Sequence, residues 1–171
     1  MKKIAILYGS TTGNTEEIAK MIAGETGEDK VDLLDVSNAS VEDVLKYDKL
    51  IMGTSTWGSG DMQDDWEAFA ESLRQTDLTG KKIALFGVGD SVTYSDTFVG
   101  GMGELYEVLK DTGAHFYGKV PADGYDYDDS PAEIDGMFVG LALDQDNEED
   151  LTEERIKNWI NTLKEEGFFD E

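Results

Sequence analysis

The chain has 171 residues, of which 39% are hydrophobic and 10% aromatic, as in one globular domain and unlike a disordered chain. Its 38 acidic and 14 basic side chains give a formal net charge of -24, which argues against binding to nucleic acid or to an anionic membrane, because both need cations against phosphates. The lack of cysteine excludes disulfides and thiolate chemistry, and the single histidine, His115, excludes a multi-histidine metal site.

Targeting signals are also missing from the printed sequence. No apolar run approaches the roughly 20 residues that span a bilayer. The basic start at Met1–Lys3 is followed by too few apolar residues for a signal peptide. The sequence therefore predicts a soluble, cytoplasmic protein.

Short apolar runs and helix-periodic segments alternate in the first half of the chain. Lys3–Tyr8 (KIAILY) is typical of a strand buried on both faces of a parallel sheet. Trp66, Phe69 and Leu73 recur at helical spacing. In chain order we predict strand Lys3–Tyr8, helix Asn14–Gly24, strand Val31–Val36, helix Ser40–Tyr47 opening with Ser-x-x-Asp, strand Lys49–Thr54 and helix Asp64–Gln75.

The second half continues the alternation until it is interrupted. We predict strand Lys82–Gly87, helix Gly103–Thr112, strand Ala114–Val120 and a final helix Leu151–Gly167, capped by Thr152. Between Pro121 and Gly136 the pattern gives way to Gly, Asp and Tyr, which we interpret as an insertion inside the fifth strand, resuming at Met137–Leu143.

This order of elements predicts an α/β fold. Apolar strands that alternate with helices form a parallel sheet covered on both faces. The sequence therefore predicts a single domain over residues 1–171, with a five-stranded parallel sheet, helices on both faces and an insertion in strand five.

In such a sheet, ligands bind outside the carboxyl ends of the strands, so the loops after strands one, three and four belong together. The first, Gly9–Thr15 (GSTTGNT), offers hydroxyls, an amide and a glycine directly before a helix, a setting that holds phosphate. It contains no Lys or Arg and is therefore not a Walker loop. The alternative is an ordinary capped turn rich in Ser and Thr.

The other two loops each combine glycines with one aromatic residue. Trp57 follows the third strand and Tyr94 the fourth. Two aromatic side chains at the mouth of one sheet suit the two faces of a planar ring, and glycines let the backbone approach its polar edge. Taken singly, each aromatic residue has a plainer interpretation, as packing at the sheet edge or as surface.

Together these segments resemble the flavodoxin family. The resemblance rests on GSTTGNT, on Thr54–Gly58 (TSTWG), on Gly87–Asp90 (GVGD) with Tyr94, on Gly124-Tyr125, and on Phe138–Asp144 (FVGLALD) leading to Asp146-Asn147. The last segments and the insertion in strand five are similar to the long-chain branch. The resemblance covers essentially the whole chain.

The resemblance implies a low-potential one-electron carrier, not an enzyme, that binds FMN noncovalently and shuttles between semiquinone and hydroquinone. By position, the resemblance implies that the phosphate is held by Ser10, Thr11, Thr12, Gly13, Asn14 and Thr15. The two flavin faces would be covered by Trp57 and Tyr94, and the flavin edge would be met by Gly58, Ser59, Gly60, Gly89 and Asp90. Ribityl or phosphate contacts would come from Thr56, Thr97 and Asp146. We assign no catalytic residue, and His115 is expected to be structural or on the surface.

Two segments depart from the family pattern. Ser91 stands where the family often has Gln, and Val99–Met102 (VGGM) replaces a common acidic and alanine pattern before the fourth helix. The extra glycine there is expected to loosen the start of that helix.

Acidic clusters at Asp61–Glu71, Asp123–Asp135 and Asp144–Glu154 suggest electrostatic docking of redox partners. The resemblance implies a flavodoxin/ferredoxin reductase and low-potential oxidoreductases as those partners, and a monomer. General solubility or life in high salt is the alternative origin of the acidity.

Two other functions remain open, an FMN-dependent quinone or nicotinamide reductase and a flavin-binding regulator. A phosphoacceptor receiver domain is excluded, because the loops after strands one and three lack its acidic residues.

Overall fold

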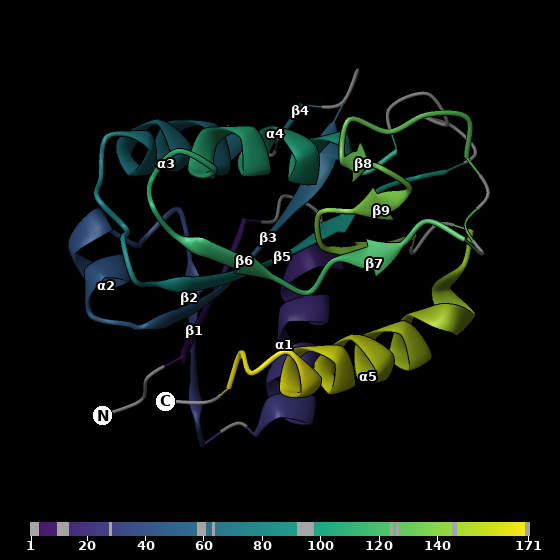
Figure 1. Ribbon diagram of the computed structural model, residues 1–171, viewed down its shortest axis with the longest axis horizontal. Helices are drawn as coiled ribbons and strands as arrows, with labels where there is room; N and C mark the ends of the chain where they lie inside the picture. Colours follow the sequence, from purple (N-terminus) through teal and green to yellow (C-terminus); the bar gives the residue numbers. More distant parts are fainter. Residues whose placement is uncertain are drawn as a thin grey trace.

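A parallel sheet with helices on both faces organises the chain (Figure 1). The computed structural model describes residues 4–9, 14–27, 29–57, 61–62, 64–91, 98–123, 125, 127–144 and 147–169. The main path of the sheet has five parallel strands, as predicted, in the spatial order β10 (Leu141–Leu143), β5 (Lys82–Val88), β3 (Lys49–Trp57), β1 (Ile4–Gly9) and β2 (Val31–Asp35).

Both faces of the central strands are buried, because the apolar runs alternate between two cores. Ile6, Ile51 and Ala84 are paired across β1, β3 and β5, and all three contribute to one core. The next residues along these strands, which include Leu7 and Met52, contribute to the other core. Side chains on successive strand residues point to opposite faces, so an uninterrupted apolar run fits only a sheet covered on both sides.

Two pairs of helices provide that cover. α3 (Asp64–Arg74) and α4 (Gly100–Leu109) lie on one face, and α1 (Asn14–Thr26) and α5 (Glu149–Glu165) on the other (Figure 1). The predicted apolar residues of α3 are all buried. Among the described residues, no helix combines the length and the apolar character needed to cross a membrane.

Helix ends confirm one sequence signal and correct two. α2 (Val41–Leu45) begins with the predicted Ser40 cap, and Ser40 and Asp43 form a reciprocal capping box. α5 begins after Glu148, however, so Thr152 lies inside the helix as a buried residue and does not cap it. α4 also starts earlier than predicted, at Gly100, because packing in the core outweighs the low helix propensity of glycine.

The predicted insertion in the fifth strand is confirmed. β6 (His115–Tyr117) and β10 both pair in parallel with β5, at opposite ends of it. Between them, β7 (Val120–Pro121), β8 (Glu133–Ile134) and β9 (Met137–Phe138) form a separate antiparallel sheet. The strand was expected to resume at Met137, but Met137–Phe138 belong to the small sheet and pairing with β5 resumes only at Leu141.

The C-terminal segment after α5 closes the amino edge of the sheet. Lys49 Nζ donates a hydrogen bond to Phe169 O at 3.0 Å, and Lys82 Nζ donates to Gly167 O at 2.8 Å. Between these anchors the Phe168 ring is fully buried and meets the Tyr117 ring edge-on, with centroids 5.6 Å apart. The segment therefore belongs to the core that α1 and α5 cover.

We predict that Phe168→Ala lowers the free energy of unfolding by about 3–5 kcal/mol, because it leaves a cavity under this segment. Phe169→Ala is the matched control, since the Phe169 side chain is only half-buried and its carbonyl bond to Lys49 is retained. Urea denaturation measures both. Equal destabilisation by the two variants would contradict the packing role assigned to Phe168.

Candidate functional site

The carboxyl ends of the central strands lie side by side. In the strand register Gly9 of β1 is opposite Thr54 of β3, and Thr54 is opposite Gly87 of β5. Val88 of β5 is in turn opposite Leu143 of β10. The segments that follow these strands therefore start from one edge of the sheet, as predicted. The edge includes the position where the chain order reverses, because β1 lies between β2 and β3, which is where open α/β sheets bind ligands.

Many of the predicted contact residues fall outside the described residues. These are Ser10, Thr11, Thr12, Gly13, Gly58, Ser59, Gly60, Tyr94, Thr97 and Asp146. The backbone places Asn14 as the first residue of α1, and Thr56 and Trp57 as the last two of β3. Thr15, Gly89 and Asp90 are described in full.

Thr15 has an unusual environment at the start of α1. Its side chain is 1% exposed, yet its Oγ1 has no hydrogen-bond partner among the described residues. Burying a hydroxyl without a partner costs about 1–3 kcal/mol, so such a group normally has one. It lies where helix N–H groups are free and the dipole is positive, which together form a set of donors for an anion.

The segment after β3 forms a hairpin that the sequence analysis missed. The strand was predicted to end at Thr54 but continues to Trp57 and pairs antiparallel with β4 (Asp61–Met62), with Trp57 opposite Asp61. The prediction was wrong because Ser and Thr after an apolar run were interpreted as a loop, whereas antiparallel pairing with a later segment keeps them extended. Trp57 therefore stands at the end of a strand, where its backbone is fixed by pairing.

The segment after β5 is held tightly at Gly89. Its N–H donates to Leu143 O at 2.9 Å, which continues the contact between β5 and β10. A Cβ at Gly89 would lie 2.9 Å from the backbone nitrogen of Val99, so only glycine fits. Val99 itself has a φ of +47°, a left-handed conformation that is rare for a β-branched residue. The backbone at Gly89 therefore lies directly against Phe98 and Val99, just before α4.

Asp144 is a residue of this edge that the sequence analysis misassigned. It was counted with a cluster of surface acids, but it is fully buried and accepts hydrogen bonds from Ser91 and Asn147. Its place directly after the apolar run of β10, at the edge where the other strands end, was the available signal.

Acidic side chains flank the same edge. The first turns of α3 and α5 lie near it, because α3 follows β4, which pairs with the last residues of β3, and α5 follows β10. Exposed acids on these two helices include Glu67, Glu71, Glu149, Asp150, Glu153 and Glu154. Near the end of β1, burial raises the pKa of the Tyr8 phenol, and the negative charges of Glu16 and Asp35 raise it further. The exposed acids of α3 and α5 therefore add negative charge near this edge.

His115 lies far from this edge. It is exposed, and it is opposite Lys82, the first residue of β5, at the amino end of the sheet. His115 was expected to be structural or on the surface, and its exposure places it on the surface.

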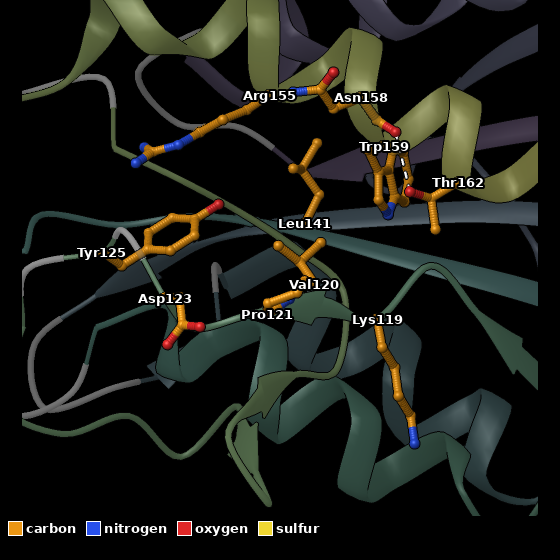
Figure 2. Close-up of a pocket in the computed structure, with 10 residues that line it drawn as sticks. All are labelled: Lys119, Val120, Pro121, Asp123, Tyr125, Leu141, Arg155, Asn158, Trp159 and Thr162. Carbon is orange, nitrogen blue, oxygen red and sulfur yellow. Dashed lines mark hydrogen bonds between the residues drawn. The ribbon is translucent and has the colours of Figure 1, made fainter.

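A separate cavity of about 340 Å³ lies between α5 and the insertion (Figure 2). Arg155 on its wall stacks 4.1 Å from the centroid of the Tyr125 ring and pairs with Glu148 at 3.0 Å. The Trp159 indole donates to Gly118 O at 2.9 Å. The Arg155 guanidinium and the Trp159 indole therefore already have partners within the chain, unlike the Thr15 hydroxyl at the start of α1.

Comparisons with known proteins agree with this geometry. The family model described as Flavodoxin matches residues 6–159. A flavodoxin of Synechocystis sp. is 48% identical over 96% of this chain and 97% of its own length, and flavodoxin 1 of Azotobacter vinelandii is 45% identical over 97% and 98%. The structure of Fusobacterium nucleatum flavodoxin bound to flavin mononucleotide superposes with a TM-score of 0.91 at 32% identity, covering 97% of this chain and 99% of that one.

We predict that Thr15→Val raises the free energy of unfolding of the ligand-free protein by about 1 kcal/mol, because it removes a buried hydroxyl that lacks a protein partner. Thr112→Val is the matched control. Thr112 is also buried, but its Oγ1 donates to Leu109 O at 2.6 Å, so this variant is expected to lose about 1 kcal/mol. Urea denaturation in phosphate-free buffer compares the two. A destabilising Thr15→Val would mean that the hydroxyl is satisfied within the chain.

Proposed function

This chain belongs to the flavodoxin family, and we propose that it is a low-potential one-electron carrier that uses noncovalently bound FMN. The observation that carries the proposal is the similarity to flavodoxins along nearly the whole chain, together with the convergence of the described strand ends at one edge. The protein transfers electrons between other proteins and has no catalytic residues of its own.

The residues at the start of α1 fit the phosphate of this cofactor. The buried Thr15 hydroxyl without a partner is the kind of donor that a bound phosphate oxygen would satisfy. Asn14 and Thr15 follow the hydroxyl-rich residues Ser10, Thr11, Thr12 and Gly13, and the whole set lacks cations. Neutral donors suit a phosphate that stays bound and is not transferred, so we assign these six residues to it.

The remaining assignments follow the family pattern. We propose that Trp57 and Tyr94 cover the two faces of the isoalloxazine ring. The backbones of Gly58, Ser59, Gly60, Gly89 and Asp90 would meet its edge, and Thr56, Thr97 and Asp146 would contact the ribityl chain or the phosphate. For Gly89 the close approach of Val99 supports a rigid backbone at this position.

The bound cofactor would supply one-electron chemistry, cycling between its semiquinone and hydroquinone. The chain would set the potential of that step. Acidic side chains at the site edge and the net charge of -24 disfavour the anionic hydroquinone and so lower the potential of the last electron. The cofactor supplies the redox chemistry, and the negative charge of the protein lowers its potential. Both support the proposal of a low-potential carrier.

We propose that redox partners dock at the same edge. The exposed acids of α3 and α5 would attract basic surfaces on a flavodoxin/ferredoxin reductase or on low-potential oxidoreductases. Opposite charges speed encounter without tight binding, which suits a carrier that must leave each partner after transfer. We propose that the protein works as a monomer in the cytoplasm.

The first test is an anaerobic reductive titration of the purified protein followed by its visible spectrum. We expect a yellow protein that accumulates a one-electron-reduced form and bleaches fully only with a strong reductant. Bleaching directly by NADPH without that form would favour a reductase instead. A protein that neither contains nor binds a flavin would contradict the proposal.

The second test concerns docking. We predict that the double variant Glu67→Gln/Glu149→Gln slows electron transfer to a basic acceptor such as cytochrome c by about threefold at low salt, and that added salt removes the difference. The control Glu25→Gln/Asp111→Asn removes the same charge at the opposite edge, near the ends of α1 and α4, and should leave the rate unchanged. Equal slowing by both pairs would indicate an effect of net charge alone.

A further inference from the structure

A single buried carboxylate joins two loops at the candidate site. Asp144 follows β10 directly, and its side chain is fully buried. A buried carboxylate is tolerated only where hydrogen bonds replace the water it has lost. The partners of Asp144 therefore indicate what this residue is for.

The first partner is Ser91, two residues beyond Gly89 in the segment after β5. Both its backbone N–H and its hydroxyl donate to Asp144 Oδ2, at 3.1 and 2.5 Å. Ser91 is itself 5% exposed. The serine is one of the two departures from the family pattern, and its hydroxyl is a donor that this chain uses to bind the carboxylate.

The second partner is Asn147, in the segment after β10. Its backbone N–H donates to Asp144 Oδ1 at 2.9 Å, and its side-chain amide contacts Oδ1 at 3.1 Å and Oδ2 at 2.9 Å. The same amide nitrogen reaches Asp90 Oδ1 at 2.8 Å. Asn147 thus bridges the carboxylates of Asp90 and Asp144 with a neutral donor and ties them into one network.

This network fixes a short piece of backbone from two sides. Gly89 packs closely against Val99 and donates a hydrogen bond to Leu143 O. Ser91 is held by its hydrogen bonds to Asp144. Asp90 lies between them, with its side chain held by Asn147. Asp144 accepts hydrogen bonds from both Ser91 and Asn147, so this one side chain links the segment after β5 to the segment after β10.

We propose that Asp144 is a positioning residue, which through Ser91 and Asn147 holds the Gly89–Asp90 backbone in the conformation that receives the flavin edge. The inference rests on the proposed function, since it concerns the ring part of the same site. Asp144 acts through the loop and not on the phosphate, which binds at the start of α1. Its loss therefore weakens binding of the ring and leaves binding of phosphate unchanged.

The test compares three ligands, FMN, riboflavin and inorganic phosphate, by calorimetric titration of the ligand-free full chain. Asp144→Asn keeps one acceptor oxygen but places an NH₂ group against donors. We expect the Kd for FMN and for riboflavin to rise by the same factor, about tenfold or more, while the Kd for phosphate stays constant. Ser91→Ala removes only the hydroxyl and is expected to raise both flavin Kd values about threefold.

The controls separate positioning from general stability. Asp111→Asn makes the same charge change at an exposed site at the end of α4 and should alter none of the three Kd values. Amide hydrogen exchange at Ser91 and Asn147 should accelerate in Asp144→Asn without ligand, because both N–H groups donate to the carboxylate. If Asp144→Asn does not fold, Ser91→Ala carries the test on its own.

The outcomes distinguish the two proposals. A wild-type chain that binds neither flavin would overturn the proposed function, and this inference with it. A wild-type chain that binds both, with variants that bind them equally well, would overturn the positioning role alone. A parallel loss of phosphate affinity would likewise overturn it, because the effect would then extend over the whole site.

Discussion

Parallel pairing of β1, β3 and β5 in a fixed register is the constraint on which the rest of the structure depends. Ile6, Ile51 and Ala84 share one face, and their neighbours along each strand share the other. A slip of one residue would exchange the two faces and misplace every helix contact. The same register aligns Gly9 with Thr54 and Gly87, so the packing that stabilises the sheet also brings the candidate loops together. The register of these three strands therefore determines both the packing of the core and the position of the candidate site.

The insertion shows how this constraint tolerates added chain. β6 and β10 pair with opposite ends of the same strand, so the antiparallel sheet between them leaves the register of β5 undisturbed. Pairing of β10 places Leu143 opposite Val88 and so delivers Asp144 to the edge where β5 ends. A split strand is thus the reason why a buried carboxylate from late in the chain binds a loop that follows β5.

The sequence was sufficient to predict the sheet, the helices on both faces and the insertion, because apolar runs and helical periodicity report burial directly. It failed where non-local packing decides the outcome. Gly100 has a low helix propensity but is buried in the first turn of α4. Strand β3 continues to Trp57 because β4 pairs with its end. Asp144 was predicted to be a surface acid because its hydrogen-bond partners, up to 53 residues away, cannot be recognised from the local sequence. Family resemblance supplied the site residues, and all of them stay predictions; Tyr94 and several others also lie outside the described residues.

The proposed phosphate site has no cations in its loop, and it lies in a chain with a net charge of -24. Two unit charges 8 Å apart in water interact by only about 0.5 kcal/mol, and salt at physiological strength screens them over roughly that distance. A hydrogen bond to a charged group contributes about 1.5–3 kcal/mol and acts at contact. The hydroxyl of Thr15 and the free N–H groups of α1 therefore outweigh distant surface acids. Negative charge can then lie around the site edge, where we propose that it lowers the potential and guides partners, without preventing the cofactor from binding.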